Sequence, residues 1–223
     1  MGGLTEFQRK VTRTVLDAAG PEFALAGGAA MIEQGIIDRS TNDTDAFSEN
    51  GDVRAAARNV TEALGRTGLG ARLDYESDTY CRILVESSSP GRETTKVELA
   101  NDSIRRPLVA TPLGPALDPL DLAVNKVLAL FGRAAARDLA DLDALDPRFG
   151  LEHLVELARQ ADRGFSRQVM GEMAWRAAQE PDQRFPDGVD VAALKEWASQ
   201  LAVALRDGEP LPPSPRRNME AGR

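Results

Sequence analysis

The sequence predicts an α+β fold in which a small mixed sheet with helices is followed by a helical half. Short apolar runs bounded by turn residues recur through the first half, as expected for strands between helices. From Pro119 onward the apolar positions repeat at helical spacing, with almost no strand signal. We therefore expect an α+β core over residues 1–117 and a helical domain over residues 118–207. Residues 208–223 are rich in proline and charge, which predicts a disordered tail.

The elements of the first half follow from apolar spacing and turn residues. Phe7, Val11 and Val15 recur at helical spacing, and Gly20 with the proline after it ends this helix. A buried strand over residues 23–26 and a helix over residues 29–34 come next. The remaining expected elements are a strand at 43–48, a helix at 52–66 and strands at 71–76, 79–86 and 94–100, with a polar turn at 87–91.

Composition limits the classes of partner. The chain has 223 residues and a formal net charge of −8, which disfavours adhesion to duplex DNA or anionic membranes. A single cysteine excludes an internal disulfide, and a single histidine excludes a histidine-rich metal site. The sequence has no run approaching the roughly 20 apolar residues that a membrane span needs. We therefore expect a cytoplasmic protein with no membrane partner.

Two aspartates in the strand at 43–48 are candidate metal ligands. Residues i and i+2 of a strand face the same side, so Asp43 and Asp45 can point together into one cleft. Converging carboxylates repel one another unless a cation lies between them, and oxygen ligands of this kind suit Mg²⁺. Glu98, in a neighbouring strand, is the candidate for a third acid. On spacing alone, two solvated loop acids are the more common source of such a pair.

The pair Gly27 and Gly28 forms the other half of the predicted site. Glycines permit close approach of the backbone, and the helix that follows them offers free N–H groups to an anion. Such a pair is more often just a turn. One short helix and one loop separate this pair from Asp43 and Asp45, and that proximity favours a phosphate-binding turn beside a metal site.

A basic stripe is predicted on one long helix that begins near Pro119. At about 100° per residue, Lys126, Arg133 and Arg137 fall within roughly 40° of one another, with Asp141 beside them. The opposite side of the helix is apolar, with Val124, Leu128, Phe131, Ala135, Leu139 and Leu142. A solvated charged face with pairs such as Arg137 and Asp141 is the alternative explanation, which periodicity alone slightly favours. A break of the helix at Gly132, which would spoil the alignment, is a further alternative, since an interior glycine costs about 1 kcal/mol relative to alanine.

Taken together, these segments resemble the nucleotidyltransferase toxins of the AbiEii/AbiGii type, found in type IV toxin–antitoxin and phage-abortive systems. The resemblance lies in GGxA, then DxD, then K-x6-R-x3-R-D-x2-D-L, within residues 20–145. The matching residues are Gly27, Gly28, Asp43, Asp45, Lys126, Arg133, Arg137, Asp138 and Asp141, with Arg39 in the usual lead-in to the acids. Many relatives carry a serine or threonine where Ala29 stands, so a hydroxyl contact to phosphate is absent here.

The resemblance implies a polymerase-beta-like nucleotidyltransferase core and assigns roles to these residues. Asp43 and Asp45 would bind Mg²⁺, and Glu98 would assist the metal or act as a base. Lys126 and Arg133 would hold the NTP, and Asp138 would orient one of them. Gly27, Gly28, Arg39 and Arg137 complete the expected nucleotide site. Metals that neutralise phosphate charge and a cation that holds the triphosphate are what nucleotidyl transfer chiefly needs.

Three functions remain open from the sequence. The first, which the resemblance favours, is transfer of a nucleoside monophosphate from an NTP to an RNA acceptor, the expected acceptor being the 3′ end of tRNA. This transfer would block translation. The second is modification of a small hydroxylated compound such as an aminoglycoside, whose positive charge suits an acidic protein. The third is a non-catalytic partner-binding relative. A toxin of this type also implies an antitoxin as a partner.

Overall fold

The computed structural model describes residues 3–88 and 92–221 of the chain. It divides into two compact units, Met1–Leu122 and Ala123–Arg223, and the division falls inside helix α4 (Pro119–Arg133). The sequence places the corresponding boundary after residue 117. Each unit is described by itself below.

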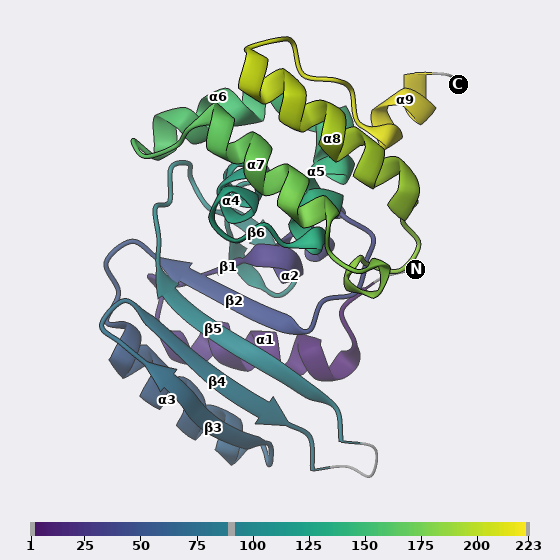
Figure 1. Cartoon of the computed structure of the whole chain (residues 1–223). Helices are drawn as coiled ribbons and strands as arrows, with labels where there is room; N and C mark the ends of the chain where they lie inside the picture. Colours follow the sequence, from purple (N-terminus) through teal and green to yellow (C-terminus); the bar gives the residue numbers. More distant parts are fainter. Residues whose placement is uncertain (1–2, 89–91, 222–223) are drawn as a thin grey trace. The chain divides into compact units, whose positions relative to one another are not determined.

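The first unit is built on a mixed sheet, which confirms the predicted fold class. Over the described residues the sheet has seven strands in the order β3-β4-β5-β2-β1-β7-β6 (Figure 1). The pairs β2–β5 and β1–β7 are parallel, and the other neighbours are antiparallel. The strands are β1 (Ala24–Ala26), β2 (Asp43–Ser48), β3 (Gly70–Glu76), β4 (Tyr80–Glu86), β5 (Thr94–Asn101), β6 (Val109–Thr111) and β7 (Gly114–Ala116).

The first five strands follow the sequence pattern, and the last two do not. The strands predicted at 23–26, 43–48, 71–76, 79–86 and 94–100 are confirmed as β1 to β5. The strands β6 and β7 escape prediction, because three residues are too few to show an alternation of apolar and polar side chains and neither strand is a wholly buried apolar run like the equally short β1. Of the polar turn predicted at 87–91, residues 89–91 lie outside the described residues.

Helices α1 (Glu6–Ala19) and α3 (Val53–Arg66) cover one face of this sheet (Figure 1). A capping box begins α1, in which Thr5 and Gln8 each bond the backbone N–H of the other. An aspartate N-cap, Asp52, begins α3. Both helices bury an apolar stripe against the sheet: Val11, Val15 and Leu16 from α1, and Val53, Ala57, Val60 and Leu64 from α3. The strand residues that alternate with those packed under the helices face the opposite side of the sheet.

The second unit is helical, as predicted. After α4 it contains α5 (Ala136–Phe149), α6 (Leu151–Ala161), α7 (Arg167–Ala178), α8 (Val191–Asp207) and α9 (Pro215–Ala221), with a short 3₁₀ turn at Asp182–Arg184. Its core is formed by leucines of α5 with Trp197 and Leu201 of α8. None of the helices in the described part of the chain combines the length and apolar character that crossing a bilayer requires.

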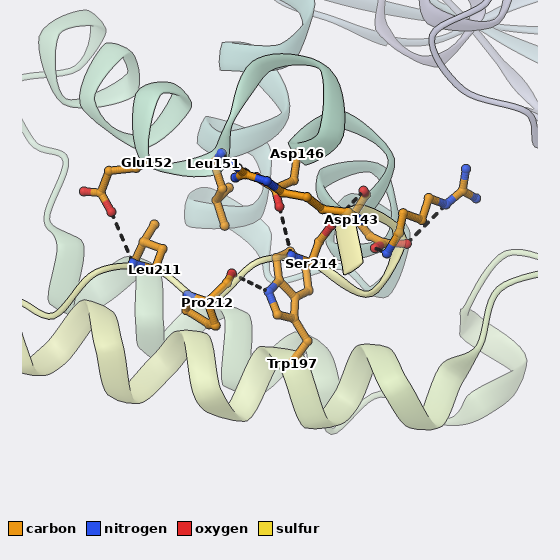
Figure 2. A network of polar contacts seen from close by, with 10 residues as sticks. Asp143, Asp146, Leu151, Glu152, Trp197, Leu211, Pro212 and Ser214 are labelled. Carbon is orange, nitrogen blue, oxygen red and sulfur yellow. Dashed lines mark hydrogen bonds and ion pairs between the residues drawn. The ribbon is translucent and has the colours of Figure 1, made fainter. Parts of the chain in front are cut away.

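The expected disordered tail is instead ordered over residues 208–221, and residues 222–223 lie outside the described residues. The backbone N–H of Ser214, which is fully buried, donates to Asp146 Oδ2 over 2.9 Å (Figure 2). That of Arg216 donates to Asp143 Oδ1 over 2.9 Å, and Trp197 Nε1 donates to the Pro212 carbonyl over 3.1 Å. The partners of the tail lie in helices that are remote in sequence. The composition of the tail alone carries no information about these contacts, so it predicts disorder.

The tail contact can be tested by Asp146→Ala. This change leaves the buried N–H groups of Ser214 and Leu151 without their acceptor and removes the ion pair with Arg217. We expect the free energy of unfolding to fall by about 3 kcal/mol and a protease to cut within residues 208–221 sooner. Asp207→Ala is the control, because Asp207 is exposed and pairs with its neighbour Arg206. Equal cleavage of the two variants would contradict the contact.

Candidate active site

Strand β2 carries the two predicted metal ligands on the face opposite α1 and α3. Thr44, Ala46 and Ser48 are buried, whereas Asp43 and Asp45 alternate with them and face the other way. Asp45 is in register with Ala26 of β1 on one side and with Glu98 of β5 on the other. One row across three strands therefore brings together Asp45, Glu98 and the residue that precedes Gly27.

The glycine pair begins helix α2 (Gly27–Glu33), two residues earlier than the helix predicted at 29–34. Gly27 has a φ of +59°, and a Cβ at this position would lie 1.7 Å from Asp45 Oδ2. No side chain other than hydrogen fits there, so Gly27 is what allows the Asp45 carboxylate to approach the backbone. At Gly28 a Cβ would lie 3.5 Å from Arg39 Nη2, which places this guanidinium beside the same turn.

Asp43 and Lys96 face each other across β2 and β5. They are in register, and Lys96 Nζ lies 4.0 Å from Asp43 Oδ1. Lys96 is a cation beside the predicted metal ligands that the sequence reasoning did not select. The alternation of β5 is a signal that could have found it, since Lys96 and Glu98 are two residues apart and share a face.

The three predicted ligands share a face but do not form a ready-made metal site. In residues 3–88 and 92–221, no group of three or more histidine, cysteine, aspartate or glutamate side chains is placed to hold a metal ion. The chemistry of Asp43, Asp45 and Glu98 nonetheless fits a divalent cation, because carboxylate oxygens are the ligands that Mg²⁺ prefers. Gly27 also lets the Asp45 carboxylate occupy the space that a Cβ would fill. Their role as metal ligands stays a prediction.

Tyr80 is a second neighbour of these acids that the sequence reasoning missed. Partial burial raises the pKa of Tyr80 to about 12, and the charge of Glu98 and a hydrogen bond with its side chain act in the same direction. Asp45 adds a smaller rise, and Arg82 opposes them. The Tyr80 phenol therefore lies close enough to Glu98 for the charge of this acid to raise its pKa.

In the second unit, Lys126 of α4 lies in a buried charged cluster. Its side chain is 10% exposed, and Nζ lies 2.8 Å from Asp141 Oδ2 and 3.4 Å from Asp138 Oδ1. Arg133 also donates two hydrogen bonds to Asp138, with Nε 2.7 Å from Oδ2 and Nη2 2.8 Å from Oδ1. Asp138 therefore contacts both cations that it was expected to orient.

The prediction of a single helix carrying a basic stripe is wrong. The chain leaves the helix after Arg133, with Ala134 at a φ of +50°, and α5 starts at Ala136. In one straight helix, Lys126 and Asp138 would be about 18 Å apart along the axis. Their contact requires the turn at Ala134. The helical periodicity continues through this turn in the sequence, but the ion pairs between α4 and α5 form only if the helix is broken there. Arg137 is exposed on α5.

The predicted site residues thus fall into two sets. The glycine turn, Arg39 and the three acids belong to the first unit, whereas Lys126, Arg133, Arg137, Asp138 and Asp141 belong to the second. The placement of Lys126 and Arg133 beside a nucleotide at Asp43 and Asp45 remains a prediction.

Comparisons with known proteins identify the family and the fold of the chain. The sequence profile of the family "Nucleotidyl transferase AbiEii toxin, Type IV TA system" matches residues 11–218. No curated protein is a match at the level of sequence.

Among solved structures, a candidate nucleotidyltransferase from H. pylori is similar with a TM-score of 0.59 at 16% identity, covering 92% of this chain and 97% of that one. JHP933 from Helicobacter pylori has a TM-score of 0.57 at 16% identity, covering 99% and 97%. MenT4, a nucleotidyltransferase toxin from Mycobacterium tuberculosis H37Rv, has a TM-score of 0.59 at 18% identity, covering 89% and 82%. At these identities the likeness establishes the fold.

The close approach of Gly27 and Asp45 predicts the effect of Gly27→Ala. Alanine here must adopt a left-handed conformation and displace the Asp45 carboxylate, so we expect stability to fall by more than the roughly 1 kcal/mol that the conformation alone costs. Gly35→Ala is the matched control, because Gly35 has a φ of +63° and nothing within 4 Å of an added Cβ. Chemical denaturation of both variants measures the difference, and equal losses would contradict the contact.

The environment of Tyr80 predicts its titration. The chain has two tyrosines, so Tyr75→Phe leaves Tyr80 as the one phenol to follow by phenolate absorbance. In metal-free buffer we expect a pKa of about 12, above the ordinary 10.0, so the folded state keeps a proton that the unfolded state loses and stability falls as the pH rises through this window. Adding Glu98→Gln should lower the pKa, though not fully to 10.0, because burial remains the largest cause. An unchanged pKa would rule out the contact with Glu98.

Proposed function

This chain belongs to the AbiEii family of nucleotidyltransferase toxins and is therefore a nucleotidyltransferase, and we propose that it transfers a nucleoside monophosphate from an NTP to the 3′ end of tRNA. The observation that carries the proposal is the row formed by Ala26, Asp45 and Glu98, in which the glycine turn that follows Ala26 meets two acids on one face of a sheet. Such a transfer would block translation by disabling the acceptor.

The acids of β2 and β5 would hold a divalent cation, which we propose to be Mg²⁺. When bound, this cation would supply positive charge to neutralise the triphosphate. In the reaction, the 3′ oxygen of the acceptor bonds to the α-phosphorus, the bond to the bridging oxygen breaks, and pyrophosphate leaves. Glu98 would assist the cation or take the proton of the attacking hydroxyl, and Tyr80 would hold Glu98 in position.

The triphosphate would be bound by the glycine turn with Arg39 and by the cations of the second unit, Lys126, Arg133 and Arg137. An ammonium has three donors, and Lys126 directs two of them to Asp138 and Asp141. This arrangement fixes the direction of the third donor, which we assign to a phosphate oxygen. Asp138 would orient Lys126 and Arg133 together through its two oxygens.

The proposed setting follows from the family. An antitoxin would control the activity, and the cytoplasm, where tRNA and NTPs are abundant, would be the place of action. A small hydroxylated acceptor such as an aminoglycoside would use the same acids and the same cation. The acceptor is therefore what the test must resolve.

Asp45→Asn tests the function. We expect transfer to fall by roughly a hundredfold or more, because the variant loses a charge needed for the cation. Stability should stay the same or rise slightly, since a repulsion between acids is removed. The assay follows each labelled NTP with Mg²⁺ and either total tRNA or an aminoglycoside, and Asp17→Asn, an exposed change on α1, is the control. Full activity of Asp45→Asn would refute the site, and labelling of the aminoglycoside alone would refute the tRNA acceptor.

A further inference from the structure

A cavity of about 650 Å³ lies over one end of the sheet of the first unit, and its lining includes Asn42, the residue before Asp43. Arg72, Leu84 and Lys96 are among its lining residues. In register, Arg72 of β3 pairs with Leu84 of β4, Leu84 with Lys96 of β5, and Lys96 with Asp43 of β2. The cavity thus has a cation at each side, Arg72 and Lys96, and the apolar Leu84 between them. The next residue of this row, on β2, is Asp43.

The two cations are well placed to meet an anionic ligand. The side chains of Arg72 and Lys96 are 69% and 52% exposed. Arg72 Nη2 lies 3.6 Å from Asp74 Oδ1 and Lys96 Nζ lies 4.0 Å from Asp43 Oδ1, distances too long for a hydrogen bond. Neither ion pair is tight, so a phosphate can gain both cations without breaking a strong contact. Glu86 is an acid in the lining of the same cavity and would repel a phosphate placed beside it.

The next row of the sheet adds an aromatic surface. Tyr75 of β3 pairs with Arg82 of β4, which pairs with Glu98 of β5. Tyr75 is 52% exposed, and its ring centroid lies 5.7 Å from that of Tyr80. Tyr80, on the neighbouring strand β4, packs against the Tyr75 ring and supports it from one side. An exposed ring held in this way suits stacking of a nucleobase.

We propose that this face of β3, β4 and β5 binds the single-stranded 3′ end of the acceptor RNA, with phosphates at Arg72 and Lys96 and one base stacked on Tyr75. The row that contains Lys96 ends at Asp43, and the row that contains Tyr75 ends at Glu98 and Asp45. An RNA strand bound along these rows therefore delivers its terminal hydroxyl to the acids. The inference rests on the proposed function and specifies where its acceptor lies. In Figure 1, β3 is the edge strand beside β4.

The test measures binding of a short fluorescent single-stranded RNA by anisotropy, without NTP. We expect Tyr75→Ala to weaken binding about tenfold and Tyr75→Phe to leave it nearly unchanged, because stacking needs the ring and not the hydroxyl. Arg72→Ala should weaken binding and reduce the salt slope by roughly 0.7, the share of one phosphate of a single strand. Trp175→Ala is the matched control, since Trp175 is an equally exposed aromatic residue of the second unit.

Several outcomes would overturn the inference. They are an absence of RNA binding by the unmodified chain, normal binding by Tyr75→Ala, or equal losses in the phenylalanine and alanine variants. A rise in the KM for NTP with unchanged RNA binding would also overturn it, because the ring would then belong to the nucleotide.

The binding assay separates this inference from the proposed function. RNA binding that depends on Tyr75, in a chain that transfers no nucleotide to RNA, would support the binding face and refute the function. Transfer to tRNA that is insensitive to Tyr75 and Arg72 would support the function and refute the binding face.

Discussion

The register of β2 between β1 and β5 is the constraint on which the candidate site depends. A strand that buries Thr44, Ala46 and Ser48 under α1 and α3 must turn Asp43 and Asp45 to the other face. A slip of one residue would place both carboxylates in the apolar core, at a cost that no hydrogen bond there would offset. The hydrophobic packing of the first unit therefore sets the direction of the acids, and Gly27 then admits the Asp45 carboxylate beside the backbone.

The second unit differs from the first, because it buries charged side chains instead of directing them away from its core. Asp138 and Asp141 are almost fully buried, and their charges are balanced by Lys126 and Arg133. Burying such a cluster is expensive, and removing any one member leaves an uncompensated charge. An apolar replacement would hold α4 and α5 together at less cost, so stability alone does not account for the cluster. A fixed ammonium with one donor to spare is what the proposed chemistry requires.

Local patterns predicted the parts of this protein that local forces decide. The alternation of β2 and β5 and the apolar stripes of α1 and α3 are visible in the sequence, and so are the acids they orient. The break at Ala134 was missed because it depends on ion pairs between two helices, and the order of the tail depends on buried aspartates of α5. Tyr80 and Lys96 were missed because their significance comes from strand pairing, which places them beside Glu98 and Asp43.

The net charge of −8 bears on how this chain would recognise the proposed RNA acceptor. A protein that repels polyanions as a whole gains little from the body of a folded RNA, where affinity grows with the number of phosphates it neutralises. Affinity must then come from a few phosphates and from contacts that do not depend on charge. A face with two loosely paired cations, an apolar floor and an exposed tyrosine meets that requirement for one short single strand. Overall acidity would thus act as a filter, because it weakens binding to long nucleic acids more than binding to a strand end.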